Sequence, residues 1–252
     1  NALSYANLGR INNIDLREKD GVLHIVTSNR TASTLDYWKF PTDGLFEYFQ
    51  NLPLDSFTED LDHAHLEAGM DIYGICMGLV GGNLRAILTE EEGKTIQYWD
   101  LKTQEIIGTI DITAEETNVP LFGNEAEGCV IDDENEHIII SREGMRGILN
   151  AYDANTLKFI KVIDSRSGNI GGDPEGVTVY KTTDKEGFII VSSQGDSKFN
   201  LYNRQFPFDY IRSFRVNDVT DTDGIDVTNK SIDGLFPQGF LVVQDGYNSP
   251  DN

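Results

Sequence analysis

The feature that most constrains the fold of this chain is a short motif that occurs four times. In each copy a polar side chain precedes a glycine and a run of β-forming apolar residues follows; the glycines are Gly74, Gly128, Gly176 and Gly224. They lie 54, 48 and 48 residues apart. A repeat of about 40 to 50 residues is typical of a β-propeller, in which each copy forms one four-stranded blade.

Short β-branched and aromatic runs follow each motif, separated by turns rich in Gly, Asp and Asn, which is the pattern of antiparallel strands. Another partial copy begins near Asn13, and the copy after Asp223 contains only two runs. A helical apolar period is absent from the sequence except within an insertion at about residues 42–66, where Gly44–Phe49 is expected to form a helical turn.

We therefore predict an all-β chain that forms a single domain over residues 1–252, with four fairly complete blades and part of a fifth. Because an open propeller exposes strand edges, the domain is expected to lack pieces at its ends.

The composition is strongly acidic, with 42 Asp and Glu against 20 Lys and Arg and a net charge of −22. Such a chain is not expected to bind nucleic acid, because a phosphate backbone requires a basic surface. No stretch reaches the roughly 18 apolar residues of a membrane span, so no membrane partner is expected. The first residues, Asn1–Ser4, are not a signal peptide. The excess carboxylate indicates either a solvated acidic surface or neutralisation by bound divalent metal.

The two cysteines, Cys76 and Cys129, fall on or beside the predicted inner strands of neighbouring repeats. We interpret them as structural thiols in preference to a disulfide or a nucleophile. His63 and His65 lie in the predicted insertion and are interpreted as surface residues; no His/Cys spacing typical of a zinc site occurs.

Three of the four residues that precede the repeated glycines are carboxylates, namely Glu127, Glu175 and Asp223, and the fourth is Tyr73. Equivalent positions of successive blades converge on the propeller axis, so we expect these side chains around a single point. A ring of oxygen ligands is suited to Ca²⁺.

The loops that follow the second strand of each repeat open onto the same face as these carboxylates. They bring Arg30 and Arg142 to the same mouth of the channel. Carboxylates that hold cations, together with guanidinium groups that hold phosphate, indicate metal-dependent hydrolysis of a polyanion.

With these motifs in this order, the chain resembles the β-propeller phytases, the alkaline 3-phytases. The resemblance extends from about Leu8 to Gly246 and rests on specific strings, among them Glu127-Gly128, Glu175-Gly176, Ser192-Ser193-Gln194-Gly195 and Asp221-Thr222-Asp223-Gly224-Ile225-Asp226. It implies a six-bladed propeller, of which about five blades are represented here. It also implies several bound Ca²⁺ ions and hydrolysis of phytate (myo-inositol hexakisphosphate), bound as its calcium complex, by metal-activated water.

The resemblance implies three overlapping sets of site residues. The expected metal ligands are Tyr73, Glu127, Glu143, Asp173, Glu175, Asp221, Asp223, Asp226, Gln244 and Asp245. The expected catalytic residues are Tyr73, Glu127, Glu175 and Asp223, and the expected substrate-binding residues are Arg30, Arg142 and Lys94.

The chain departs from the family pattern in four places. An N-terminal segment that carries a calcium ligand and a lysine pair has no match, and neither has the last strand after Gln244-Asp245-Gly246. Glu91 occupies the position of a family lysine, for which Lys94 is a possible replacement, and Arg142 stands where an acid is expected. These departures suggest a fragment or a shortened, weakly active domain beside a second phytase domain.

We expect a calcium-dependent phosphomonoesterase that is a secreted or periplasmic monomer. Two alternatives remain open: a non-catalytic binding propeller and a calcium-dependent propeller lactonase.

Overall fold

The computed structural model describes residues 9–44, 62–115, 125–232 and 234–246. As predicted, this part of the chain is all-β, with one short 3-10 turn, η1 (Gln194–Asp196), between strands. None of its helical segments is long and apolar enough to cross a membrane. The strands are, in chain order, β1 (Ile11–Lys19), β2 (Val22–Asn29), β3 (Thr34–Pro41), β4 (Asp62–Glu67), β5 (Ile72–Val80), β6 (Asn83–Glu90), β7 (Thr95–Asp100), β8 (Glu105–Asp111), β9 (Ala126–Asp132), β10 (His137–Arg142), β11 (Ile148–Asp153), β12 (Phe159–Ser165), β13 (Pro174–Lys181), β14 (Gly187–Ser193), β15 (Lys198–Asn203), β16 (Tyr210–Phe214), β17 (Ile225–Thr228) and β18 (Phe240–Val243).

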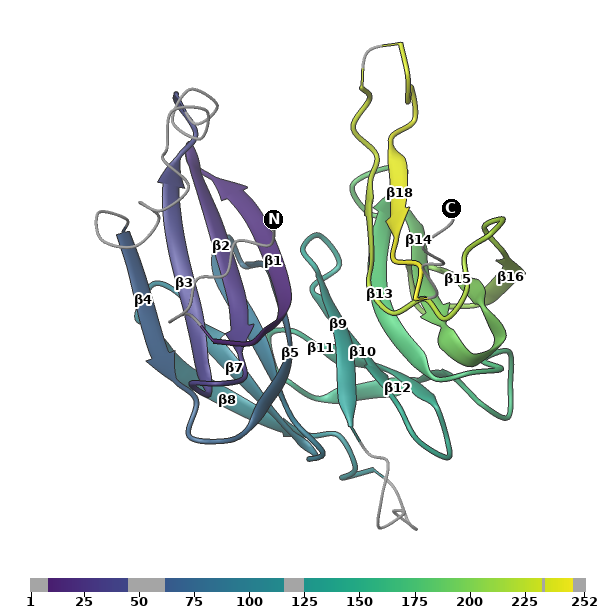
Figure 1. Ribbon diagram of the computed structural model, residues 1–252, viewed down its shortest axis with the longest axis horizontal. Coiled ribbons are helices and arrows are strands. Elements are labelled where there is room, and N and C mark those ends of the chain that lie inside the picture. The colour runs from purple at the N-terminus through teal and green to yellow at the C-terminus, as the bar shows by residue number, and fades with distance from the viewer. Residues whose placement is uncertain (1–8, 45–61, 116–124, 233, 247–252) are drawn as a thin grey trace.

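The strands form propeller blades: within each sheet, strands that are adjacent in sequence pair with one another. Four antiparallel sheets contain β1–β4, β5–β8, β9–β12 and β13–β16, and a fifth sheet contains β17 and β18. Tight hairpin turns such as Asp20-Gly21 and Gly81-Gly82 adopt the positive φ that such turns require. The first strands β1, β5, β9, β13 and β17 contact one another in that order. Figure 1 shows the sheets side by side around them, from purple β1 to yellow β18.

The four fairly complete blades and the part of a fifth that the repeats predict are present in the described residues, but the six blades implied by the resemblance are not, and the extent of the insertion differs. The described residues contain four complete blades and one two-stranded sheet, not five or six blades, because the last repeat contributes only β17 and β18 there. Residues 62–67 are not part of an insertion: they form β4, the outer strand of the first blade. In the predicted helical turn Gly44–Phe49, only Gly44 lies within the described residues.

The hydrophobic core lies between the blades. One apolar cluster joins the first and second blades, another the second and third, and another the third and fourth. The middle strands of the second and third blades are therefore covered on both faces. Ile138, Ile139 and Ile140 of β10 are successive residues with at most 1% of their surface exposed. Such burial explains the continuous apolar runs in the sequence.

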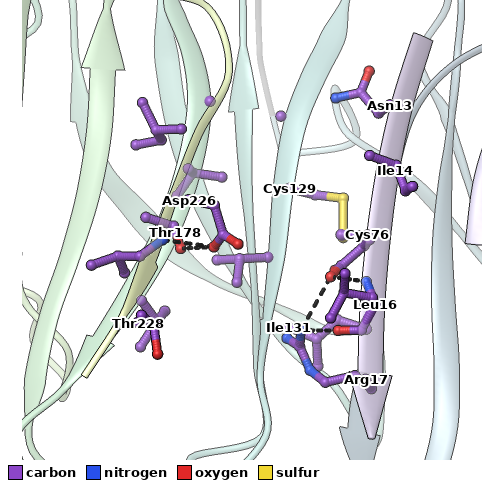
Figure 2. A pocket seen from close by; sticks show the side chains of 18 of the residues that line it. Asn13, Ile14, Leu16, Arg17, Cys76, Cys129, Ile131, Thr178, Asp226 and Thr228 are labelled. Atoms are coloured by element: carbon purple, nitrogen blue, oxygen red, sulfur yellow. Dashed lines mark hydrogen bonds and ion pairs between the residues drawn. A yellow bond between two sulfur atoms is a disulfide. The ribbon is translucent and has the colours of Figure 1, made fainter. Parts of the chain in front are cut away.

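Cys76 and Cys129 form a disulfide, which corrects their interpretation as thiols. They lie on β5 and β9, the inner strands of neighbouring blades, with Cα atoms 5.7 Å apart. Their sequence separation of 53 matches the repeat period, but the pairing of strands from different sheets is set only by blade packing. Figure 2 shows the disulfide in the channel wall between the two strands.

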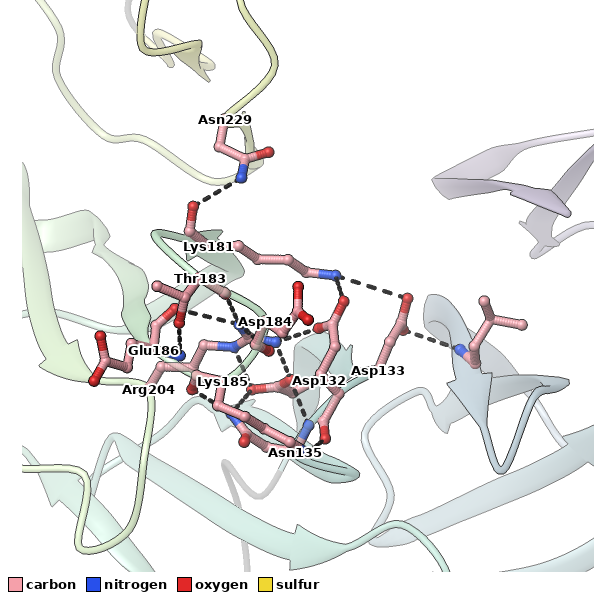
Figure 3. A network of polar contacts seen from close by, with 12 residues as sticks. Asp132, Asp133, Asn135, Lys181, Thr183, Asp184, Lys185, Glu186, Arg204 and Asn229 are labelled. Carbon is pink, nitrogen blue, oxygen red and sulfur yellow. Dashed lines mark hydrogen bonds and ion pairs between the residues drawn. The ribbon is translucent and has the colours of Figure 1, made fainter.

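A buried ion-pair network joins the third and fourth blades at the end of the channel opposite to the repeated motifs (Figure 3). The Arg204 side chain is 0% exposed and its Nε donates to Asp132 Oδ2 at 2.7 Å. Arg204 also pairs with Glu134, and its Nη1 donates to backbone carbonyls of the turn at residues 183–186. Burial favours the neutral form of Asp132, but the Arg204 hydrogen bonds and charge outweigh it and hold the pKa of Asp132 below its usual range.

Candidate metal centre at the channel mouth

The repeated glycines permit neighbouring blades to approach closely. A Cβ atom added at any of three of them would lie under 3.0 Å from a backbone carbonyl of the next blade. In each case the carbonyl belongs to the residue that precedes the next glycine; the pairs are Gly74 with Glu127, Gly128 with Glu175, and Gly176 with Asp223. A side chain at these positions would force the inner strands apart.

Hydroxyl groups of the second strands lie at these contacts, and two of them hydrogen-bond to the next blade. Ser141 Oγ accepts a hydrogen bond from the Gly128 N–H at 2.9 Å and donates to the Glu175 carbonyl of the next blade. Ser192 Oγ donates to the Asp223 carbonyl at 2.8 Å, and Thr89 Oγ1 accepts from the Gly74 N–H at 2.7 Å. The backbones of Glu175 and Asp223 are thus tied to the preceding blade by hydrogen bonds.

Local backbone irregularities aim these side chains. The β5–β6, β9–β10 and β13–β14 ladders each shift register where the inner strand carries Tyr73, Glu127 and Glu175 respectively. Bulges of this kind redirect a side chain and are common beside functional sites. Recurrence of the bulge in successive blades explains how a sequence repeat becomes a ring of side chains.

Three carboxylates converge at this mouth. Glu127, Glu143 and Glu175 each offer an oxygen, and these three atoms lie within 4.8 Å of one another. Glu127 and Glu175 start the inner strands of the third and fourth blades, whereas Glu143 directly follows β10. The structure thus brings together three of the expected metal ligands.

Glu175 is the most constrained member of this group, which we call the glutamate triad. It is 1% exposed, and neither of its carboxylate oxygens has a hydrogen-bond partner in the described part of the chain. Burial, followed by the effect of Glu127, strongly raises the pKa of Glu175; burial also raises the pKa of Glu143. Three carboxylates so close require either protons or a cation, and hard oxygen donors suit Ca²⁺.

Tyr73 and Arg30 lie beside the triad. Burial and then the neighbouring Glu127 carboxylate raise the pKa of Tyr73, so its phenol stays protonated at neutral pH. The Arg30 guanidinium carbon lies 4.5 Å from the centroid of the Tyr73 ring. Arg30 also forms an ion pair with Glu91, from the loop that follows β6.

Asp223 occupies the next position around the ring. Burial raises its pKa, which the hydrogen bonds from Gln194 and Gln244 partly offset. The Gln194 amide donates to the Asp223 carboxylate, and the Asp223 N–H donates to Gln244 Oε1 at 2.9 Å. Asp223 and Gln244 are therefore brought together, as expected.

Several expected metal ligands have other partners. Asp173 forms an ion pair with Arg166. Asp245 Oδ1 accepts from the backbone of Thr220 at 3.0 Å, and Asp221, which is exposed, donates its N–H to Ser197.

Asp226 lies further along the channel, on β17. It accepts a hydrogen bond from Thr178 Oγ1 at 3.2 Å (Figure 2). This part of the cavity, which has a volume of about 530 Å³, is lined by the inner strands and also carries Arg17.

Two of the three expected phosphate-binding cations are not presented to the mouth. Arg142 is 1% exposed and its Nη1 donates to the Ile112 carbonyl at 2.9 Å, so its guanidinium is engaged inside the fold. Lys94 Nζ lies 2.7 Å from Asp111 Oδ2 on β8, the outermost strand of its blade. Arg142 ends β10, whereas Arg30 follows β2, so the two arginines do not hold equivalent positions.

The sequence prediction missed Glu125. Burial raises its pKa, and the Glu143 charge adds to this effect, while its carboxylate accepts from the backbone N–H of Glu92 at 3.3 Å. Glu125 lies two residues before Glu127, a spacing that places both side chains on one face of an extended segment. The spacing of two residues between Glu125 and Glu127 could therefore have identified Glu125 from the sequence.

Comparison with known proteins agrees with these motifs. A family model described as phytase matches residues 1–252. A curated 3-phytase of Bacillus subtilis (strain 168) is 29% identical over 259 residues, which cover 95% of this chain and 64% of that protein. The chain thus spans about 64% of the length of this relative.

Solved structures with little sequence similarity share the fold. They include a hydrazine synthase of Kuenenia stuttgartiensis, with a TM-score of 0.58 at 11% identity over 87% of this chain and 53% of that one. A nidogen/laminin complex has a TM-score of 0.56 at 10% identity over 87% and 69% of the two chains. A mitotic checkpoint complex has a TM-score of 0.55 at 9% identity over 86% and 57%. At such identities the likeness concerns the fold alone.

Proposed function

Because the chain belongs to the phytase family, we propose that it is a calcium-dependent phosphomonoesterase that releases phosphate from phytate at the glutamate triad. The observation that carries this proposal is the Glu175 carboxylate, which is buried, lacks a hydrogen-bond partner among the described residues and faces two more carboxylates. A buried charge is costly unless it is paired or coordinates a metal.

The donors present fit calcium. Ca²⁺ takes about six to eight oxygen ligands, and Glu127, Glu143 and Glu175 supply carboxylate oxygens within 4.8 Å of one another. Asp223 and Gln244, which lie in contact, are proposed to help hold a further ion. Bound calcium would neutralise the carboxylates, hold substrate phosphate and lower the pKa of a water molecule for attack.

The other side chains bind and orient the substrate. Arg30 presents a planar guanidinium, which matches phosphate oxygens in bidentate fashion. The Tyr73 ring lies against that guanidinium and fixes its position. The neutral Tyr73 hydroxyl, hydrogen bonded to Glu127, holds a proton beside the triad without adding negative charge.

We also propose that the protein is a monomer that functions in an oxidising compartment, outside the cell or in the periplasm. The Cys76–Cys129 disulfide supports the compartment, because disulfides persist where thiols are not kept reduced.

Phosphate release from phytate tests the proposed function. We expect release with millimolar Ca²⁺, its loss with chelator and with Glu175→Gln, and an optimum at neutral to alkaline pH, because carboxylates bind metal only when ionised. Release that is unaffected by both chelator and Glu175→Gln would refute it.

A calcium-binding propeller without turnover is the second candidate, because Arg142 and Lys94 are engaged elsewhere. It predicts that the protein binds Ca²⁺ and inositol hexasulfate but releases no phosphate from phytate at any calcium concentration.

A further inference from the structure

The guanidinium proposed to bind phosphate is already paired with an anion of its own chain. Arg30 Nη2 forms the ion pair with Glu91, and Arg30 Nη1 lies 3.4 Å from Asn12 Oδ1. Arg30 Nε is buried. Only 10% of the Arg30 side chain is exposed, against 33% of the Glu91 side chain. A phosphate that uses this guanidinium must therefore displace Glu91.

Backbone hydrogen bonds hold the two loops that carry Arg30 and Glu91 in place at the channel mouth. The Arg30 N–H donates to the Arg10 carbonyl at 2.8 Å, and the Glu91 N–H donates to the Asp71 carbonyl at 2.9 Å. Arg30 belongs to the loop after β2 of the first blade and Glu91 to the loop after β6 of the second. The contact between them thus spans a blade seam beside Tyr73.

The displaced carboxylate would remain in an acidic environment. Glu125 and the glutamate triad lie at the same mouth, and the charge of Arg30 acts on Glu125. Release of Glu91 from Arg30 therefore leaves one more uncompensated negative charge beside these groups. Like charges in such proximity repel each other, which opposes the exchange.

We propose that Glu91 is a specificity-determining residue that competes with substrate phosphate for Arg30. A ligand with one phosphate gains too little to displace it, whereas a ligand with several clustered phosphates makes further contacts at the mouth that compensate. The chain therefore selects polyphosphorylated over monophosphorylated ligands. This inference rests on the proposed function, since it takes the channel mouth as the phosphate site.

Binding of two probes, inositol hexasulfate and inorganic phosphate, tests the role of Glu91. Calorimetry at fixed Ca²⁺ would compare the parent chain with Glu91→Gln and Glu91→Ala. The control is Glu92→Gln, which removes the same charge from the same loop, where the backbone N–H of Glu92 contacts Glu125. We expect both Glu91 variants to bind hexasulfate roughly five- to tenfold more tightly, from the strength of a partly buried ion pair. Inorganic phosphate should gain by a larger factor, and the control should change less than about twofold for either probe.

The pairwise origin of the effect is tested in an Arg30→Ala background. Glu91→Gln should have no effect there, because the partner is gone. Equal affinities of the parent and both Glu91 variants for both probes, or an equal gain in Glu92→Gln, would overturn the role of Glu91.

These outcomes separate this inference from the proposed function. Calcium-dependent phosphate release by the parent, with affinities unchanged by Glu91→Gln, removes the competitor role and leaves the phytase proposal standing. Failure of every variant to bind hexasulfate or release phosphate from phytate would reject both. Hexasulfate binding by Glu91→Gln but not by the parent would support the competitor role most directly.

Discussion

Replacement of Glu175 by glutamine should have opposite effects on stability without and with calcium. Two ionised carboxylates with oxygens at most 4.8 Å apart repel each other by about 3.5 kcal/mol or more at an effective dielectric constant of about 20. The calcium-free protein relieves part of this repulsion by retaining a proton on the triad. We therefore expect Glu175→Gln to stabilise the calcium-free protein by about 1–2 kcal/mol, or about 2–8 °C in Tm.

The pH dependence of this effect has a definite sign. Because burial and Glu127 raise the pKa of Glu175, the folded calcium-free chain binds a proton that the unfolded chain releases above the ordinary glutamate value. Its stability should therefore fall as pH rises above about 4.5, towards the raised value. The advantage of Glu175→Gln should be small at pH 5 and larger at pH 8.

Calcium should reverse the order of the two proteins. An ion at a hundredfold excess over its Kd stabilises the folded state by about 2.7 kcal/mol, and the variant should lose most of that gain. Thermal melts at pH 8 with chelator and with Ca²⁺ measure both effects, with Glu105→Gln on exposed β8 as the control. A calcium-free Glu175→Gln that melts below the parent, or equal stabilisation of both by Ca²⁺, would refute the triad as a strained metal centre.

Three further changes test the fold around the site. Arg204→Met should lower the free energy of unfolding by about 3–5 kcal/mol, because it leaves Asp132 charged and buried. Since Arg204 lowers the pKa of Asp132, this loss should shrink as pH falls below about 4. A loss that urea titrations show to be independent of pH would contradict this. Joint replacement of Cys76 and Cys129 by serine should cost about 4 kcal/mol from the lost cross-link; an unchanged urea midpoint would show that the disulfide does not form. Ser141→Ala should lower the free energy of unfolding by about 1–3 kcal/mol, since it leaves buried backbone groups unpaired. It should also weaken Ca²⁺ binding; an unchanged affinity in calorimetry would show that this contact between blades does not position the metal ligands.

The repeat period and strand pattern were sufficient to predict the blades and the convergence of Glu127 and Glu175, because equivalent repeat positions must meet at an axis. The hydrogen-bond and ion-pair partners of individual side chains could not be predicted from the repeat. Arg142 is the last residue of β10 and turns inward to the Ile112 carbonyl, whereas Arg30 follows β2 and lies at the mouth. The repeat did not show on which side of the strand end each arginine falls, and that single position decides which one reaches the mouth.

The remaining differences also arise from contacts between blades. Cys76 and Cys129 pair across a seam that no single repeat encodes. The alternation of polar and apolar residues in Asp62–Glu67 is that of a half-exposed strand, and the predicted insertion obscured it. Local pattern thus predicts each sheet, whereas packing between sheets decides the disulfide and the cation positions.

The close contacts of Gly74, Gly128 and Gly176 with the next blade fix the width of the channel mouth. Glu127, Glu175 and Asp223 each meet the blade before them through their own carbonyl, so the spacing of these three side chains follows the spacing of the blades. If these carboxylates hold the proposed calcium ion, discrimination between cations of different radius resides in the backbone of the seams rather than in the carboxylates. An added methyl group at Gly128 would then widen the mouth without altering a ligand and favour an ion larger than calcium.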